Sequence, residues 1–177
     1  MRALLAPSTW SRPKGPTLES TESLSGGPRV AVLGVGNLLL KDEGIGVHVA
    51  HTLKEMGLDS GANLNILDAG TCPDVILSLD SVDKLIIVDA AEGNCEPGTI
   101  YRFRPGDVAS SAEACSAHEM SFSHSLMMLD VLGAKPKDVV IIGVQPKEVD
   151  WGLEPSVELA QRIPDIVRLV VEETKKC

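Results

Sequence analysis

Two carboxylates and one imidazole stand at places in the sequence where side chains can act on a ligand. Glu43 ends the segment GVGNLLLKDE, which follows an apolar run; Asp89 closes the run KLIIVD; His118 precedes a helical pattern in SAHEMSF. Carboxylates and a neutral imidazole form a ligand set that suits a divalent transition metal with open coordination positions. These three residues are the candidate site, and the competing interpretation is that they are three unrelated surface residues.

The arrangement of strands and helices determines whether the three residues lie close together in the folded protein. Short β-branched apolar runs predict buried strands, and stretches with a 3.6-residue apolar period predict the helices between them. Ligands bind beyond the carboxyl ends of the strands in such α/β sheets, so the three residues converge if the first, third and last parallel strands are neighbours. The predicted buried strands cover residues 29–35, 63–67, 84–89 and 138–144, and a fifth strand, 98–104, is predicted at an edge because Ile100 and Phe103 alternate with charged residues. The predicted helices cover 44–57, 73–80, 119–132 and 154–174.

The glycines of GVGNLLLKDEGIG raise the alternative of a dinucleotide-dependent oxidoreductase. The fingerprint G-x-G-x-x-G requires a glycine where this chain has Leu39. Asp42 and Glu43 would open the following helix, where they would repel a pyrophosphate. Asp42 is either a helix cap or a partner of the site. The dinucleotide enzyme is the third hypothesis, and failure to bind NAD(H) or NADP(H) in a fluorescence titration would remove it.

The histidines have less specific surroundings. The capping-box spacing of SAHE places His118 in the first turn of a helix, where the positive end of the helix dipole favours a neutral imidazole. The alternative is a solvated loop histidine, and a nucleophilic pair of Cys115 with His118 is disfavoured because neighbouring residues seldom align for proton transfer. His48, His51 and Glu55 share a helix flank away from the apolar stripe, which predicts a solvated face.

The composition of the chain limits the classes of protein to which it can belong. The chain has 177 residues, which suits one domain, and its core must be largely aliphatic because 44% of residues are hydrophobic and only 3% aromatic. A net charge of -9 argues against nucleic acid and anionic membranes as partners. The four cysteines lack zinc-site spacing, and no signal peptide or membrane span is evident, so a cytoplasmic protein is expected. Residues 1–28 are predicted to be a disordered tail, and residues 29–177 the folded domain.

Six segments in order resemble the nickel-iron hydrogenase maturation endopeptidases over residues 29 to about 172. These segments read GVGNLLLKDEGIG, LDAGT, IIVDA, PGTIYRF, SAHEMSF and IIGVQPKEVDWG. The resemblance implies a three-layer α/β/α sandwich with a five-stranded twisted mixed sheet, in which strand 98–104 runs antiparallel at an edge. It also implies removal of a C-terminal extension from the hydrogenase large subunit after nickel insertion. The chain departs from the family at Ala69, where a glycine is common, and in its N-terminal segment.

The resemblance places the metal contacts and the catalytic role on Glu43, Asp89 and His118. It implies that nickel arrives with the large-subunit precursor and that the enzyme holds no tightly bound cofactor of its own. We expect the protein to be a monomer. Gly34, Gly36 and Gly44 are expected to bring backbone close to the incoming peptide, with Asn37 as a hydrogen-bond donor there.

No serine or cysteine nucleophile is visible, so a second hypothesis remains. The protein would then be a non-proteolytic, nickel-sensing docking chaperone for the same precursor. Whether incubation shortens the large subunit on a gel separates the two hypotheses.

Overall fold

The computed structural model describes residues 27–61, 63–79, 81–105 and 119–176 of the chain. Residues 1–26 of the predicted tail lie outside this part, and so does His118.

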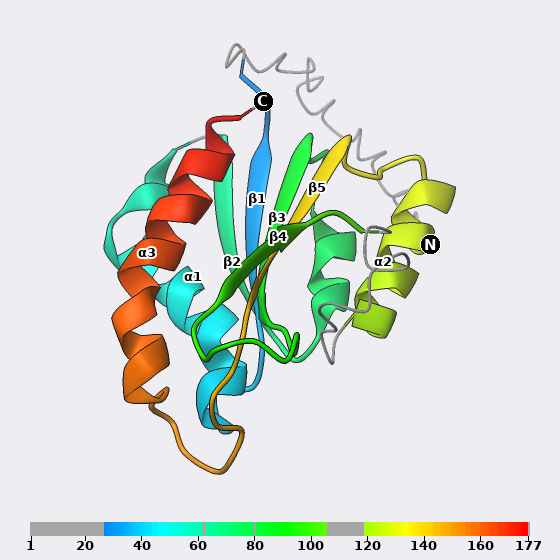
Figure 1. Cartoon of the computed structure of the whole chain (residues 1–177). Helices are drawn as coiled ribbons and strands as arrows, with labels where there is room; N and C mark the ends of the chain where they lie inside the picture. The colour runs from blue at the N-terminus through cyan, green and yellow to red at the C-terminus, as the bar shows by residue number, and fades with distance from the viewer. Residues whose placement is uncertain (1–26, 62, 80, 106–118, 177) are drawn as a thin grey trace, which may run out of the picture.

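A five-stranded sheet forms the centre of the fold, with the strand order β2-β1-β3-β5-β4 (Figure 1). The first four of these strands run parallel, and β4 pairs antiparallel with β5 at the edge, as expected from the sequence. Because β1, β3 and β5 are consecutive neighbours, the condition for a shared site at their carboxyl ends is met. The strands are β1 (Val30–Val35), β2 (Leu64–Gly70), β3 (Lys84–Ala90), β4 (Ile100–Phe103) and β5 (Asp138–Val144).

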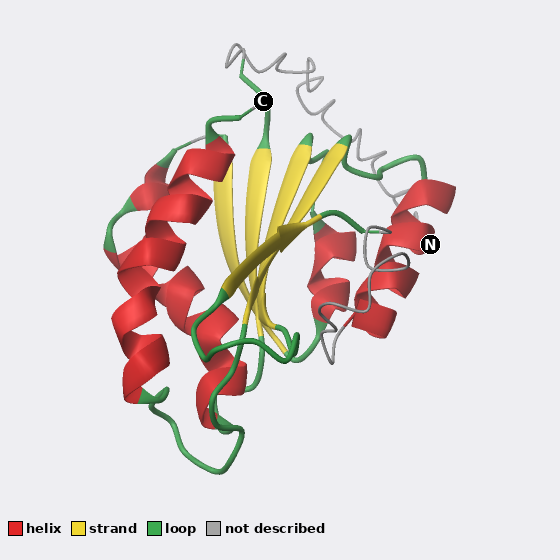
Figure 2. Ribbon diagram, in the orientation of Figure 1, coloured by secondary structure: helices red, strands yellow, loops and turns green. Residues whose placement is uncertain are grey.

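Helices cover both faces of the sheet and complete a three-layer sandwich. Figure 2 shows two long helices, α1 and α3, on one face, and α2 with the short helix η3 on the other. The predicted helix at 73–80 is a six-residue 3-10 helix with a proline at its first position. The helices are η1 (Lys41–Gly44), α1 (Ile45–Glu55), η2 (Leu58–Ser60), η3 (Pro73–Ser78), α2 (Glu119–Val131) and α3 (Val157–Thr174).

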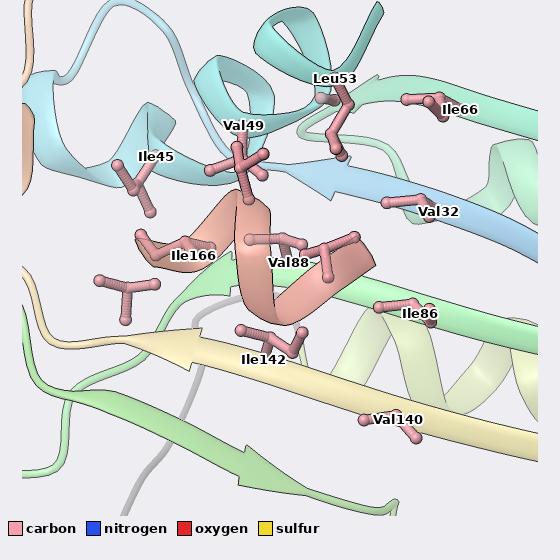
Figure 3. Close-up of a cluster of buried hydrophobic side chains, with 14 of the residues drawn as sticks. Val32, Ile45, Val49, Leu53, Ile66, Ile86, Val88, Val140, Ile142 and Ile166 are labelled. Carbon is pink, nitrogen blue, oxygen red and sulfur yellow. The ribbon is translucent and has the colours of Figure 1, made fainter. Parts of the chain in front are cut away.

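Two aliphatic cores lie on opposite faces of the sheet. Successive strand residues alternate between them: Val32, Ile86 and Ile142 pack under α1 and α3 (Figure 3). Leu33 and Leu85 belong to the second core, which includes side chains of α2. Both faces of the central strands are therefore buried, which explains why their sequences are continuously apolar rather than alternating.

A cluster of buried charges closes the amino end of the sheet. Lys84, the first residue of β3, lies 2.9 Å from Glu173 near the end of α3 and 3.2 Å from Asp138, the first residue of β5. Arg102 of β4 donates two hydrogen bonds to Glu173, at 3.0 and 2.9 Å. The hydrogen bonds from Arg102, followed by that from Lys84, hold the pKa of Glu173 far below its ordinary value despite burial.

None of the helices in the described ranges is long and apolar enough to cross a membrane.

Candidate active site

Glu43 lies in η1, immediately before α1 and beyond the carboxyl end of β1. Its Oε2 accepts a hydrogen bond from the backbone N–H of Asn37 at 2.9 Å. The side-chain oxygen of Asn37 accepts the N–H of Leu39 at 3.0 Å, which closes the turn between the strand and η1. Asn37 thus orients Glu43 through its backbone, and donation by its amide to a substrate remains a prediction.

Asp89 is the penultimate residue of β3 and is only 3% exposed. Its Oδ1 accepts the N–H of Ala90 at 2.9 Å. The preceding residue, Val88, touches the start of α1: a Cβ added to Gly46 would lie 2.1 Å from the carbonyl oxygen of Val88. Glu43 precedes Gly46 by one helical turn. Glu43, which follows β1, and Asp89, near the end of β3, therefore both lie at the carboxyl end of the sheet, on neighbouring strands.

The glycines of the first loop have a role that the sequence did not predict. A Cβ at Gly34 would stand 2.2 Å from the carbonyl oxygen of Gly46, and one at Gly36 would stand 1.9 Å from that of Glu43. Gly36 also has a φ of 136°, which favours glycine. The space beside these residues is filled by the protein's own backbone. They allow η1 and α1 to fold tightly onto β1, and they do not leave room for an incoming peptide at these positions.

Asp42 is the anchor of the loop between β5 and α3. Its side chain is fully buried, and its carboxylate accepts four hydrogen bonds. It therefore fixes the loop 147–156 against η1, and no side-chain cap is formed at the start of its own helix. The donors are the backbone N–H groups of Lys147 and Glu148 at 2.9 Å each, the N–H of Ser156 at 2.6 Å, and the Ser156 hydroxyl at 2.9 Å.

Gln145 organises the loop that follows Asp89, although the sequence alone did not single it out. It comes directly after β5, is 3% exposed, and its Nε2 donates to Glu92 at 2.7 Å. In the sequence, the one sign of this role was the position of a glutamine immediately after a continuously apolar strand. Its Oε1 accepts the N–H of Gly93 at 2.8 Å, the N–H of Cys95 at 3.3 Å and the hydroxyl of Tyr101 at 2.9 Å.

Burial, followed by the interaction with the Cys95 thiol, raises the pKa of Tyr101 to about 12. The loop beside Asp89 therefore keeps the Tyr101 hydroxyl protonated at neutral pH, where it donates to Gln145.

The described histidines do not form a metal site. His51 Nε2 lies 2.8 Å from Asp68 Oδ2. His48 is half-buried, not solvated as predicted: its Nε2 is buried without a hydrogen-bond partner in the described structure, and burial lowers its pKa. His124 is exposed on α2. Within the described residues, no three His, Cys, Asp or Glu side chains are grouped closely enough to hold a metal ion; the third predicted ligand, His118, lies outside them.

Comparisons with known sequences connect this arrangement to one family. The sequence model of a family described as hydrogenase maturation protease (HycI) matches residues 47–173. The hydrogenase expression/formation protein HupD of Thiocapsa roseopersicina is 34% identical over 151 residues, covering 82% of this chain and 67% of HupD. The hydrogenase 2 maturation protease of Escherichia coli is 36% identical over 135 residues, covering 73% of this chain and 82% of the relative.

Solved structures show the same fold. The hydrogenase maturating endopeptidase HybD from E. coli has a TM-score of 0.72 and 28% identity, covering 84% of this chain and 93% of HybD. The [NiFe] hydrogenase maturation protease HybD from Thermococcus kodakarensis has a TM-score of 0.70 and 28% identity, covering 81% and 97%. These matches confirm the predicted α/β fold. The chain therefore belongs to the hydrogenase maturation protease family, a family of endopeptidases.

Proposed function

We propose that this protein removes the C-terminal extension from the nickel-loaded large-subunit precursor of a nickel-iron hydrogenase. The observation that carries the proposal is that Glu43 and Asp89 both lie at the carboxyl end of the sheet, where each has one carboxylate oxygen that accepts a hydrogen bond from a backbone N–H. Family membership supports the class of reaction, and HybD of T. kodakarensis is named a [NiFe] hydrogenase maturation protease.

In this proposal nickel is part of the substrate. Glu43, Asp89 and His118 complete the coordination of an ion that the precursor already holds through cysteine thiolates. Carboxylate and imidazole ligands suit such an ion, and one backbone hydrogen bond to a carboxylate is compatible with coordination because the group has about four lone-pair positions. The loaded precursor then binds more tightly than the empty one, which makes the ion the recognition element.

The carboxylates also have a role in hydrolysis. An attacking water must lose a proton, and Glu43 or Asp89 serves as the base that accepts it. The ion contributes by polarising the scissile carbonyl or the water. No cofactor of the enzyme's own is required, so metal analysis of the purified protein should find nickel far below one ion per chain.

Processing of purified precursor with and without nickel tests the proposal. Glu43→Gln, Asp89→Asn and His118→Ala should each lower the rate by about 1,000-fold or more, equivalent to roughly 4 kcal/mol of transition-state stabilisation. Their urea midpoints should stay close to that of the parent protein. Glu55→Gln removes the same charge from an exposed position of α1 and should process normally.

Two results would contradict the proposal. Normal cleavage by all three variants would exclude the proposed site. Nickel-dependent binding of the precursor without shortening of the large subunit on a gel would instead identify a docking chaperone.

The other parts of the proposal concern the setting of the reaction. We propose that the protein is a cytoplasmic monomer, that its partner is the precursor, and that it binds neither nucleic acid nor a membrane. Light scattering after size exclusion should give the mass of one chain, 18.8 kDa, for the free protein.

A further inference from the structure

Four large apolar side chains are exposed on the loop between β5 and α3 and on the segment that is hydrogen-bonded to this loop. Trp151 is 76% exposed, Leu153 62%, Val149 56% and Leu39 51%. We call these four residues the Trp151 surface. Single exposed apolar residues are ordinary, but a group that includes a tryptophan, which carries a large apolar area, indicates an interaction site.

Backbone hydrogen bonds hold the two parts of the Trp151 surface together. The N–H of Gly152 donates to the carbonyl of Leu39 at 3.0 Å, and the N–H of Lys41 donates to the carbonyl of Gly152 at 2.9 Å. These bonds form a parallel bridge between Leu40 and Gly152. Leu39 and Trp151 each precede a bridged residue, so they stand next to one another.

The loop that carries Trp151 is fixed at both ends by Asp42. Its buried carboxylate binds the N–H groups of Lys147 and Glu148 at one end and Ser156 at the other. Exposure of the apolar side chains is therefore a property of an ordered loop. A partner that docks there loses little free energy in ordering the loop, which is the advantage of a preorganised surface.

The Trp151 surface is continuous with the proposed active site. Leu39 lies in the turn that leads into η1, the helix that contains Glu43, and Asp42 joins the loop to η1 directly beside Glu43. In Figure 1 the loop from β5 to α3 extends below the start of α1, at the carboxyl end of the sheet. A polypeptide seated on this surface is thus placed beside Glu43.

The charges around the surface indicate the chemistry of its occupant. Lys41 forms an ion pair with Glu148, and Lys147 forms one with Glu158. These pairs neutralise both bases, whereas Asp150 and Glu154 add two exposed acids within the loop. An apolar segment flanked by basic residues complements this surface, and the net charge of -9 on the whole chain favours the same partner.

We infer that the Trp151 surface docks an apolar segment of the large-subunit precursor that is flanked by basic residues, and holds it beside Glu43. This inference rests on the proposed function, which it deepens by naming the surface that recognises the protein part of the substrate. The residues of the surface act in binding and do not take part in the chemical step.

Steady-state processing of purified nickel-loaded precursor tests the inference. Trp151→Gln and Leu153→Gln should each raise KM by about 10-fold or more with kcat changed less than about 2-fold, because uniform binding is lost. Trp151→Phe should recover most of the affinity. Leu132→Gln, which alters an apolar residue 65% exposed after α2, is the matched control and should leave KM unchanged. Urea midpoints of all variants should match the parent protein.

The failure of this inference is distinguishable from failure of the proposed function. If the parent protein cleaves the precursor and the Trp151 and Leu153 variants keep its KM, the docking surface is wrong and the proposed function stands. If the parent protein does not cleave, fluorescence anisotropy of labelled precursor decides: weaker binding by Trp151→Gln supports the surface, and equal binding overturns it. Glu154→Lys should raise KM about threefold, and a lower KM would overturn the basic assignment of the occupant.

Discussion

The two ends of the sheet bury acidic side chains in different ways. At the amino end, Glu173 is 1% exposed and is paired with the cations of Arg102 and Lys84. At the carboxyl end, Asp42 is fully buried and binds N–H groups and a hydroxyl, while Asp89 accepts the N–H of its neighbour. Neutral donors stabilise a carboxylate without cancelling its formal charge. The difference shows that one end is built as a closed ion cluster and the other keeps negative charge beside the site proposed for a cation.

The largest effect on stability is expected at the amino end. Glu173→Gln leaves Arg102 and Lys84 facing a neutral side chain, and removing one member of a buried charge pair costs about 3–5 kcal/mol. Urea denaturation followed by circular dichroism measures the loss, and processing at low temperature should persist because the site lies at the other end. Glu172→Gln, at the exposed neighbouring position, should change the free energy of unfolding by less than about 0.5 kcal/mol. Equal stability of the two variants would contradict the closed cluster.

A smaller loss of stability, accompanied by weaker binding of the precursor, is expected for Asp42→Asn. In this variant a side-chain amide nitrogen, which is a donor, would replace one carboxylate oxygen that now accepts hydrogen bonds from the loop 147–156. Hydrogen bonds to a charged group contribute about 1.5–3 kcal/mol each. We expect a destabilisation of about 2–3 kcal/mol and a KM for the precursor raised about 10-fold, because the loop that carries Trp151 is no longer fixed. Asp59→Asn, an exposed change of the same kind, is the control. An unchanged KM would show that Asp42 does not contribute to docking of the precursor.

Acid should narrow the stability difference between the parent protein and Glu173→Gln. The pKa of Glu173 is depressed in the folded state, so its contribution is fully present above the unfolded pKa of about 4.5 and is lost as pH falls toward the folded value. The difference in free energy of unfolding should shrink by about 1.4 kcal/mol per pH unit below that point. Urea titrations at pH 7, 4.5 and 3.5 measure it. A constant difference would show that the carboxylate charge is not responsible.

The smallest effect is spectroscopic and concerns the carboxyl end. Tyr101 is the only tyrosine of the chain, so its ionisation can be followed directly by absorbance at alkaline pH. Burial places the midpoint at about 12, compared with the ordinary value of 10.0. In concentrated urea the midpoint should return to about 10. A midpoint near 10 while circular dichroism still shows the folded protein would mean that Tyr101 is more open to water than its place beside Gln145 indicates.

The sheet was predictable from sequence because its strands are buried on both faces. Residues 30–35 and 139–144 are continuous apolar runs whose residues fill two cores, so local pattern and tertiary packing agree. The edge strand β4 was recognised by its alternation with charged residues, and Arg102 uses that exposure to reach Glu173. The positions of Glu43 and Asp89, after or at the end of an apolar run, likewise identified them as residues at the carboxyl end of the sheet.

The residues that arrange the site were not predictable in the same way. Asp42 finds its partners in the loop 147–156, and Gln145 finds its own in the loop after β3. Such pairings depend on which strands are neighbours, and neither residue has a local signal that specifies a distant partner. The glycines were misinterpreted for the same reason: a short sequence shows that backbone comes close to something, but not that the contact is with the protein's own α1.

The Asp42 anchor has a consequence for the order in which the protein matures. It joins residues 114 positions apart in the chain, from the first loop of the fold to the start of its last helix. At a synthesis rate of about 5–20 residues per second, Ser156 is made roughly 6–23 s after Asp42. The carboxyl end of the sheet therefore stays incomplete in a nascent chain until the fold is nearly finished, and a truncated product that stops before α3 would carry the Glu43 loop without its support.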